Sequence, residues 1–307
     1  MQKVVLGRTG LRVSNLGLGA GGDSRLGHAK DEAGAVRLVR AAIAEGVDFL
    51  DTAEAYGTED IIGRALVDVP RQRVVISTKK TTFEQQVEAD DLVRSLEASL
   101  RRLRTDYIDI YHLHGVRPGR YVELRDRLLP TLIKLREQGK IRFFGITEAF
   151  HDDPQHTMLQ AALADDLWDV VMVGFNMLNQ SARELVFPRT LAQQVGTLIM
   201  FAVRRALSQS ERLAQLLNEL AARGKIDPET AAQGLGYLIH ESGAVSMVDA
   251  AYRFCRDEPG AHVVLSGTGS AAHLRDNVRS LSRPVLPARD RARLIAQFSG
   301  VDDVSGH

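Results

Sequence analysis

The feature of this sequence that most restricts its fold is a series of eight short apolar runs rich in β-branched residues, separated by longer stretches of helical character. This alternation is typical of a parallel sheet whose strands are joined by crossover helices. Because eight parallel strands close into a barrel, we predict an α/β fold, a (β/α)8 TIM barrel. The runs are residues 14–19, 47–51, 74–79, 107–114, 143–147, 170–175, 197–201 and 262–266.

Helical periodicity fills the intervals between these runs. Residues 36–45 have apolar side chains at helical spacing, and Gly46 follows them as a typical helix C-cap. We therefore expect strand and helix to alternate along the chain. Similar patterns, each before a strand-like run, occupy residues 92–103, 124–136, 158–167 and 245–254.

Two segments interrupt this repeat. Residues 4–13 form two short strand-like runs around a Gly-Arg-Thr-Gly turn, which predicts an N-terminal β-hairpin that plugs the bottom of the barrel. Residues 204–246 are helical in pattern, so we expect an insertion between the seventh and eighth strands, near the active-site mouth. No linker divides the chain, and we expect residues 1–307 to form one domain with a frayed polar tail after Phe298.

The composition argues against several classes of partner. Lys plus Arg and Asp plus Glu number 39 each, so no net charge attracts nucleic acid or an anionic membrane surface. No apolar run approaches the ~20 residues that span a membrane, and the N-terminus lacks an apolar signal core. Cys255 is the only cysteine, which fits a reducing compartment. We expect a cytoplasmic protein without a metal, and the sequence leaves its oligomeric state open.

Polar residues gather at the ends of three neighbouring predicted strands, where (β/α)8 barrels have their active sites. The second strand ends at Asp51 and leads into a loop with Tyr56, while the third ends at Lys79. The fourth carries His112 and His114 on one face, because side chains alternate with a period of two. Taken singly, a strand-end Asp is more often a turn former and a loop Tyr a packing residue. Their convergence predicts an active site.

An Asp, a Tyr, a Lys and a His at one mouth can perform acid–base chemistry on a carbonyl group. A Tyr hydroxyl has an ordinary pKa of about 10, and a nearby ammonium group lowers that pKa. We expect Lys79 to supply this charge to Tyr56. Asp51 would hold Lys79 through an ion pair, and His114 would hydrogen-bond the substrate oxygen. A hydride has to come from a cofactor, since no side chain can donate one.

The sequence around these residues resembles the aldo-keto reductases. Residues 51–57, Asp-Thr-Ala-Glu-Ala-Tyr-Gly, are similar to the centre of that family's first signature. The resemblance extends from residue 3 to about residue 282, and its motifs are specific as a set. Further similar segments are residues 106–114, 137–147, 169–179 and 265–277.

The resemblance implies reversible reduction of a small aldehyde or ketone to an alcohol, with NADPH or NADH as the cofactor. It makes Tyr56 the general acid/base, with Asp51, Lys79 and His114 as its partners. The family's Ser-Asn pair, which holds the nicotinamide amide, appears here as Thr147 and Glu148, and its Gln on the sixth strand as Met172. Its stacking Tyr appears as Phe201, whose ring can also stack.

The same resemblance places the rest of the cofactor near the last strand. After that strand no Lys or Arg occurs before Arg275, although Lys and Arg are the usual partners of a phosphate. We therefore hypothesise that NADH is used as well as NADPH. The further residues expected to contact the cofactor are Gly21, Arg204, Ser266, Gly267, Thr268, Ser270, His273 and Asn277.

Three alternatives remain open from sequence. Residues 17–22 are glycine-rich like a dinucleotide-binding fingerprint, but no acidic residue follows about 20 positions later on a second strand. A nicotinamide-binding regulatory or scaffold subunit with little turnover would keep the same fold. A hydrolase or isomerase barrel would need a metal cluster or a pair of carboxylates at a strand end. Residues 23–30 and 116–121 are the loops expected to shape the substrate pocket.

Overall fold

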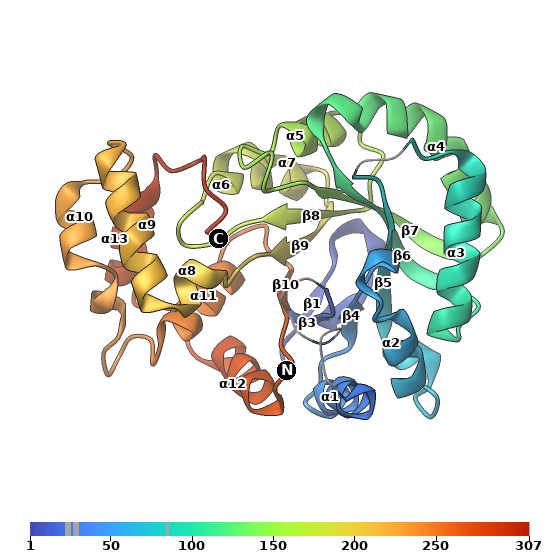
Figure 1. The fold of residues 1–307 in the computed structure, drawn as a ribbon, viewed down its shortest axis with the longest axis horizontal. Helices are drawn as coiled ribbons and strands as arrows, with labels where there is room; N and C mark the ends of the chain where they lie inside the picture. The colour runs from blue at the N-terminus through green and yellow to red at the C-terminus, as the bar shows by residue number, and fades with distance from the viewer. Residues whose placement is uncertain (22–25, 27–30, 84–85, 307) are drawn as a thin grey trace.

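The computed structural model describes residues 1–21, 26, 31–83 and 86–306. Eight parallel strands form a closed barrel in the order β10-β3-β4-β5-β6-β7-β8-β9, which confirms the predicted (β/α)8 architecture (Figure 1). Each predicted run overlaps one of these strands. The strands are β3 (Leu16–Gly19), β4 (Phe49–Asp51), β5 (Val75–Thr81), β6 (Ile108–Val116), β7 (Ile141–Glu148), β8 (Val170–Gly174), β9 (Gly196–Met200) and β10 (Val263–Ser266).

Helices surround the barrel because each has one apolar face. In α3 (Ala89–Leu103), Leu92, Leu96 and Leu100 are buried, and a capping box between Glu88 and Asp91 begins the helix. The other helices of the repeat are α1 (Glu32–Ala44), α2 (Glu59–Ala65), α4 (Tyr121–Glu137), α5 (Thr157–Ala164), α6 (Ala182–Leu185), α7 (Phe187–Ala192), α11 (Met247–Arg256) and α12 (Ala271–Ser282).

The predicted N-terminal hairpin is present. Strands β1 (Lys3–Val5) and β2 (Arg12–Ser14) pair antiparallel around a 3-10 turn, η1 (Gly7–Thr9). Leu6 and Val13 of this hairpin belong to a buried apolar cluster with Phe49, Ile110, Val170, Met172, Leu198 and Val263 of the barrel strands. The hairpin therefore closes the N-terminal end of the barrel, as expected.

Alternation along the strands places polar side chains above this apolar layer. Asp51 lies two residues beyond Phe49, and His112 and His114 lie two and four residues beyond Ile110. Side chains two residues apart on a strand share a face, so these groups point into the C-terminal half of the barrel. The floor of the barrel is therefore apolar and its mouth polar.

The chain between β9 and β10 is largely helical. It contains α8 (Arg205–Ser208), α9 (Ser210–Ala222), α10 (Pro228–Gln233) and a 3-10 turn, η6 (Gly236–Leu238). In Figure 1, α9 and α10 lie beside α13 (Ala288–Phe298), beyond the ends of β8 and β9. None of the helices in the described ranges is long and apolar enough to cross a membrane.

The tail after Phe298 is not frayed, which corrects the expectation from its polar sequence. The carbonyl oxygens of Val304 and Ser305 accept hydrogen bonds from Asn179 and Asn176 at 2.9 and 3.3 Å. Lys225 donates to the Asp302 carboxylate at 2.9 Å. These partners lie in loops distant in sequence, so no local pattern could have indicated them.

Candidate active site

Tyr56 lies on a short 3-10 turn, η3 (Glu54–Tyr56), just after β4. Gly57 ends the turn with a φ of 69°, a conformation that favours glycine. The hydroxyls of Thr52 and Thr58, on either side of this turn, are 2.8 Å apart and hold its two ends together. Glu54 fixes the turn to β5 by accepting hydrogen bonds from Lys80 Nζ at 2.9 Å and the Thr81 amide at 2.8 Å.

Asp51 and Lys79 form a fully buried ion pair beside this turn. Lys79 Nζ is 2.7 Å from both carboxylate oxygens of Asp51, and it also donates to the Thr52 carbonyl at 2.6 Å. The ammonium group lies 5.1 Å from the centre of the Tyr56 ring. Lys79 is therefore held by Asp51 and placed next to Tyr56.

His114 completes the group. Its Nε2 atom is 3.1 Å from the Tyr56 hydroxyl, and the two rings meet edge to face with centroids 5.3 Å apart. Phe83 also packs against the imidazole, with ring centroids 4.7 Å apart. The structure thus brings together all four residues that the sequence predicts for catalysis.

Burial dominates the ionisation of these residues. Burial, and then the charge of Asp51, raise the pKa of Tyr56 above its ordinary value. The net direction is therefore opposite to the lowering expected from Lys79, because burial and the charge of Asp51 outweigh that lowering. Burial and the Lys79 charge lower the pKa of His114 well below its ordinary value. Tyr56 is a protonated phenol and His114 a neutral imidazole at neutral pH.

Gly21 packs against the face of the Tyr56 ring. A Cβ atom added at this position would overlap the ring carbons, so the loop after β3 needs a glycine there. The rest of that predicted substrate loop, residues 22–25 and 27–30, lies outside the described residues. The second predicted loop comprises the end of β6, a 3-10 turn, η5 (Pro118–Arg120), and Tyr121 at the start of α4.

Of the residues predicted to bind the nicotinamide amide, only Thr147 has a hydrogen-bonding group that is still able to do so in the structure. Thr147 Oγ1 accepts a hydrogen bond from the Gly115 amide at 2.7 Å, and no described residue accepts its hydroxyl proton. Glu148 is fully buried and committed to His156 Nδ1, at 2.9 and 3.0 Å, and to the Gly174 amide, at 2.7 Å. Met172 is part of the apolar floor.

Phe201 and Arg204 form a stacked pair at the end of β9. The Arg204 guanidinium carbon lies 4.0 Å from the centroid of the Phe201 ring, and Nη2 is 3.2 Å from His151 Nε2. Phe201 has a φ of 65°, which is strained for a residue with a side chain. Strain of this kind is retained where the surroundings hold a residue in a specific position.

The residues predicted after the last strand divide into buried and exposed groups. Ser266 is buried and accepts hydrogen bonds from Tyr252 and from Asn277, at 3.0 and 2.8 Å. Ser270 caps α12, and its amide donates to Thr268 Oγ1 at 3.0 Å. The exposed members are Gly267 and His273. The N-terminus of α12 is thus open to solvent between them.

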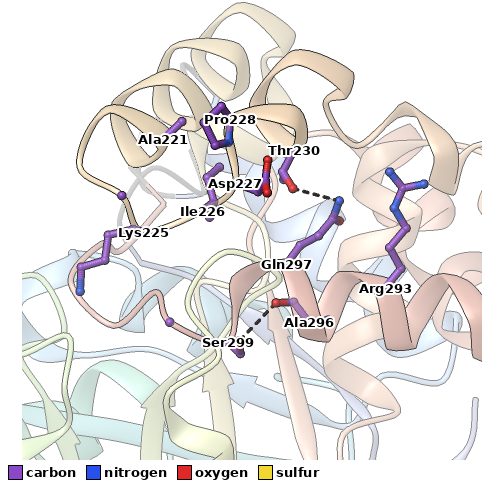
Figure 2. A pocket seen from close by; sticks show the side chains of 12 residues that line it. Ala221, Lys225, Ile226, Asp227, Pro228, Thr230, Arg293, Ala296, Gln297 and Ser299 are labelled. Carbon is purple, nitrogen blue, oxygen red and sulfur yellow. Dashed lines mark hydrogen bonds between the residues drawn. The ribbon is translucent and has the colours of Figure 1, made fainter.

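A surface groove lies away from these residues. It has a volume of about 770 Å³ and runs between the loop before α10 and the end of α13 (Figure 2). Its polar groups are satisfied locally: Gln297 donates to Thr230 at 3.3 Å, and Ser299 donates to the Ala296 carbonyl at 3.2 Å. Among the described residues, no group of His, Cys, Asp and Glu is arranged to hold a metal.

Sequence reasoning missed two residues that support the site. Ser77 lies two residues before Lys79 on β5 and donates to Asp51 at 2.8 Å, so the period of two could have identified it. His156 binds Glu148 from the loop before α5, and no sequence signal connects these two residues. The first was within reach of the strand pattern, whereas the second required the tertiary structure.

Comparison with known proteins identifies the family. The family model for the aldo/keto reductase family matches residues 15–296, which is most of the chain. The chain belongs to the aldo/keto reductase family. Aldo-keto reductase YhdN of Bacillus subtilis is 26% identical over 296 residues, which cover 89% of this chain and 87% of that protein. The fold described above is therefore that of an oxidoreductase family.

A second relative is more similar over a shorter stretch. L-galactose dehydrogenase of Arabidopsis thaliana is 36% identical over 149 residues, and the match covers 46% of this chain and only 47% of that enzyme. Among solved structures, aldo-keto reductase AKR11C1 from Bacillus halodurans superposes with a TM-score of 0.74 at 24% identity, covering 97% of this chain and 96% of its own. An aldo-keto reductase from Klebsiella pneumoniae in complex with NADPH gives a TM-score of 0.69 at 23% identity, over 97% and 95% of the chains. These structural matches establish the common fold.

Proposed function

We propose that this aldo-keto reductase catalyses the NAD(P)H-dependent reduction of an aldehyde or ketone to an alcohol, or the reverse oxidation, with Tyr56 as the general acid/base. The observation that carries the proposal is the 3.1 Å contact between the Tyr56 hydroxyl and His114 Nε2 beside the buried Lys79–Asp51 ion pair. This arrangement supplies a proton donor, a hydrogen-bonding imidazole and a fixed positive charge at one point.

In the reduction, the Tyr56 hydroxyl gives its proton to the carbonyl oxygen as negative charge develops there. The raised pKa of Tyr56 keeps the proton on the phenol until that moment. The ammonium of Lys79 then stabilises the phenolate that remains, because an adjacent opposite charge favours the ionised form. His114, which is neutral, orients the substrate oxygen by a hydrogen bond.

The chain has suitable residues for a nicotinamide dinucleotide, which when bound supplies the hydride that no side chain can donate. Phe201 offers an aromatic face for the nicotinamide, and Thr147 offers a hydroxyl for its amide. Arg204 and the capped N-terminus of α12, at Ser270, would hold the phosphates. The similarity to a Klebsiella pneumoniae enzyme in complex with NADPH supports the same class of cofactor.

We further propose that the preference between NADPH and NADH is weak. His273 is exposed where a charged contact to a 2′-phosphate would be expected, and it is a poorer phosphate ligand than Arg. His273→Arg should tighten NADPH binding about ten- to a hundredfold relative to NADH, since a charged hydrogen bond contributes about 1.5–3 kcal/mol. His240→Arg, at a distant exposed histidine, is the matched control. A natural NADPH preference above about a hundredfold would refute the proposal.

The experiment that tests the function combines binding with turnover. NADPH and NADH are titrated by fluorescence, and turnover is followed by absorbance on a panel of aldehydes and ketones, with L-galactose added for the oxidation direction because of the Arabidopsis relative. Tyr56→Phe should bind cofactor normally and lose most of its turnover. Full turnover by Tyr56→Phe would disprove the assignment. Binding without turnover by the natural protein would instead favour the regulatory-subunit alternative.

A further inference from the structure

The barrel lumen contains a second buried histidine for which the proposed reaction has no direct use. His112 lies two residues before His114 on β6 and is fully buried. Its ring occupies space that the facing strand leaves open, since a Cβ atom added at Gly145 of β7 would overlap the imidazole. The two strands are in register at these positions, His112 opposite Gly145. A glycine at residue 145 is therefore required for this ring to fit.

His112 is connected to the catalytic group through Ser77. The Ser77 hydroxyl oxygen lies 3.0 Å from His112 Nε2 and 2.8 Å from Asp51 Oδ1. Register brings these residues together, because Asp51 of β4 faces Ser77 of β5 and Lys79 of β5 faces His112 of β6. All of them are buried, so no water is needed to complete the chain.

The chemistry of the groups fixes the direction of these hydrogen bonds. An ionised carboxylate only accepts, so the single Ser77 proton goes to Asp51. Ser77 must then accept from His112, which places the imidazole proton on Nε2 and leaves Nδ1 bare. Consistent with this, His112 Nδ1 has no hydrogen-bond partner among the described residues. The result is a one-way series of donors from His112 to Ser77 to Asp51.

The charges around this series agree with a neutral His112. Burial lowers the pKa of His112 well below its ordinary value, and the charges of Lys79 and His114 act in the same direction. The Ile146 backbone beside the ring opposes the lowering without reaching hydrogen-bond geometry. Burial also raises the pKa of Asp51, while Lys79 and Ser77 oppose that rise. Ser77 thus helps to keep Asp51 ionised and paired with Lys79.

We propose that Ser77 and His112 are positioning residues for the reaction at Tyr56: through directed hydrogen bonds they hold the Asp51 carboxylate against Lys79. The proposal rests on the proposed function for its kinetic consequences, but the hydrogen-bond series itself does not. Its two parts are therefore tested separately, one by spectroscopy and one by turnover.

The first test is nitrogen NMR on protein labelled with ¹⁵N-histidine, with His112 assigned from the missing signals of His112→Gln. His112 should stay neutral from about pH 5 to 8 and carry its proton on Nε2, because burial keeps its pKa far below the ordinary value of about 6.5. In Ser77→Ala, which removes the acceptor of the Nε2 proton, the position of the proton on the His112 ring should change. A proton on Nδ1, or titration near pH 6.5, would overturn the proposed direction of the series, whatever reaction the protein catalyses.

The second test compares kcat with cofactor affinity. Ser77→Ala and His112→Leu should each lower kcat about tenfold, the rate equivalent of one lost hydrogen bond, with the cofactor Kd unchanged. The double variant should also lose about tenfold rather than a hundredfold, since the two residues act through one contact. Ser77→Thr keeps the hydroxyl and His112→Gln keeps a donor, and both should restore most of the activity.

The matched control is His262→Leu. His262 Nδ1 lies 2.8 Å from the Thr197 hydroxyl, a similar pairing at the opposite end of the barrel, and its loss should leave kcat unchanged. Unchanged kcat in Ser77→Ala and His112→Leu, or equal losses in the His262→Leu control, would overturn the positioning role. A fully active Tyr56→Phe would disprove the proposed function while leaving the NMR result to decide the hydrogen-bond series.

Discussion

Gly21 is the single residue whose enlargement should disturb the site most directly. Gly21→Ala places a methyl group into the Tyr56 ring, so the ring or its loop must move. We expect kcat to fall by about ten- to a hundredfold, because a displacement near 1 Å can have that effect. Thermal unfolding should change little. Gly236→Ala is the control, since an added Cβ there meets nothing within 4 Å; equal effects of the two changes would contradict the argument.

The ionisation of His114 predicts a feature of the pH profile. Because its pKa is lowered by burial and by Lys79, His114 should remain neutral as the pH falls through about 6.5, the ordinary histidine value. The kcat/KM for reduction should therefore show no inflection near that pH. An inflection that disappears in His114→Gln would show that His114 is protonated in this range.

Individual site residues were predictable to different degrees. Asp51, Lys79 and His114 follow from strand ends and the period of two, because a closed parallel barrel brings those ends together. The role of Glu148 could not be predicted in this way, since its carboxylate is bound by His156 from a loop. Propensity and spacing carry no information about such pairs, which exist only once the chain has folded.

At the scale of elements, Glu148 and His156 join the ends of β7 and β8. Glu148 binds both His156 and the Gly174 amide. The side chains of Glu148 and His156 are both fully buried. His156→Ala would leave the buried Glu148 carboxyl group without its histidine hydrogen-bond partner, which should lower the free energy of unfolding by about 1–3 kcal/mol. Urea unfolding measures the change. The exposed Asp91–Arg94 pair is the control: Arg94→Ala should change stability by less than about 1 kcal/mol.

The elements themselves were largely predictable. The eight strand runs, the hairpin and the helical stretches all correspond to observed elements, because hydrophobic periodicity reports which face of each element is buried. The prediction of a frayed tail was wrong for the opposite reason. Residues 301–306 are ordered chiefly by side chains from distant loops, such as Asn176, Asn179 and Lys225, and local sequence does not encode those contacts.

At the scale of the molecule, the tail connects three of the loops at the barrel mouth. The Gly306 carbonyl accepts from the Ala206 amide at 3.2 Å, next to Arg204, and Ser305 contacts His151 at 3.2 Å. Asn176 donates both to Ser305 and to the Phe201 carbonyl. The tail thus supports the segment proposed to bind the cofactor.

Deletion of residues 302–307 should therefore weaken cofactor binding. We expect the Kd for NADPH to rise about tenfold, in line with the loss of one or two net hydrogen bonds that hold the Phe201–Arg204 segment. Fluorescence titration gives the Kd. Asp303→Ala removes the outer ion pairs with Arg223 and Lys225 and should leave the Kd unchanged. An unaltered Kd in the deletion, with a lower unfolding temperature, would mean that the tail supports only the fold.

The closure of the barrel has a consequence for how the protein is made. Strand β3, which ends at Gly19, pairs with β10, which begins at Val263. Ribosomes add roughly 5–20 residues per second, so β3 waits on the order of tens of seconds for its partner. During that time its edge, and that of β9 once made, are unpaired and prone to associate with other chains. The yield of soluble protein should therefore depend on translation rate and on chaperones as well as on the stability of the finished barrel.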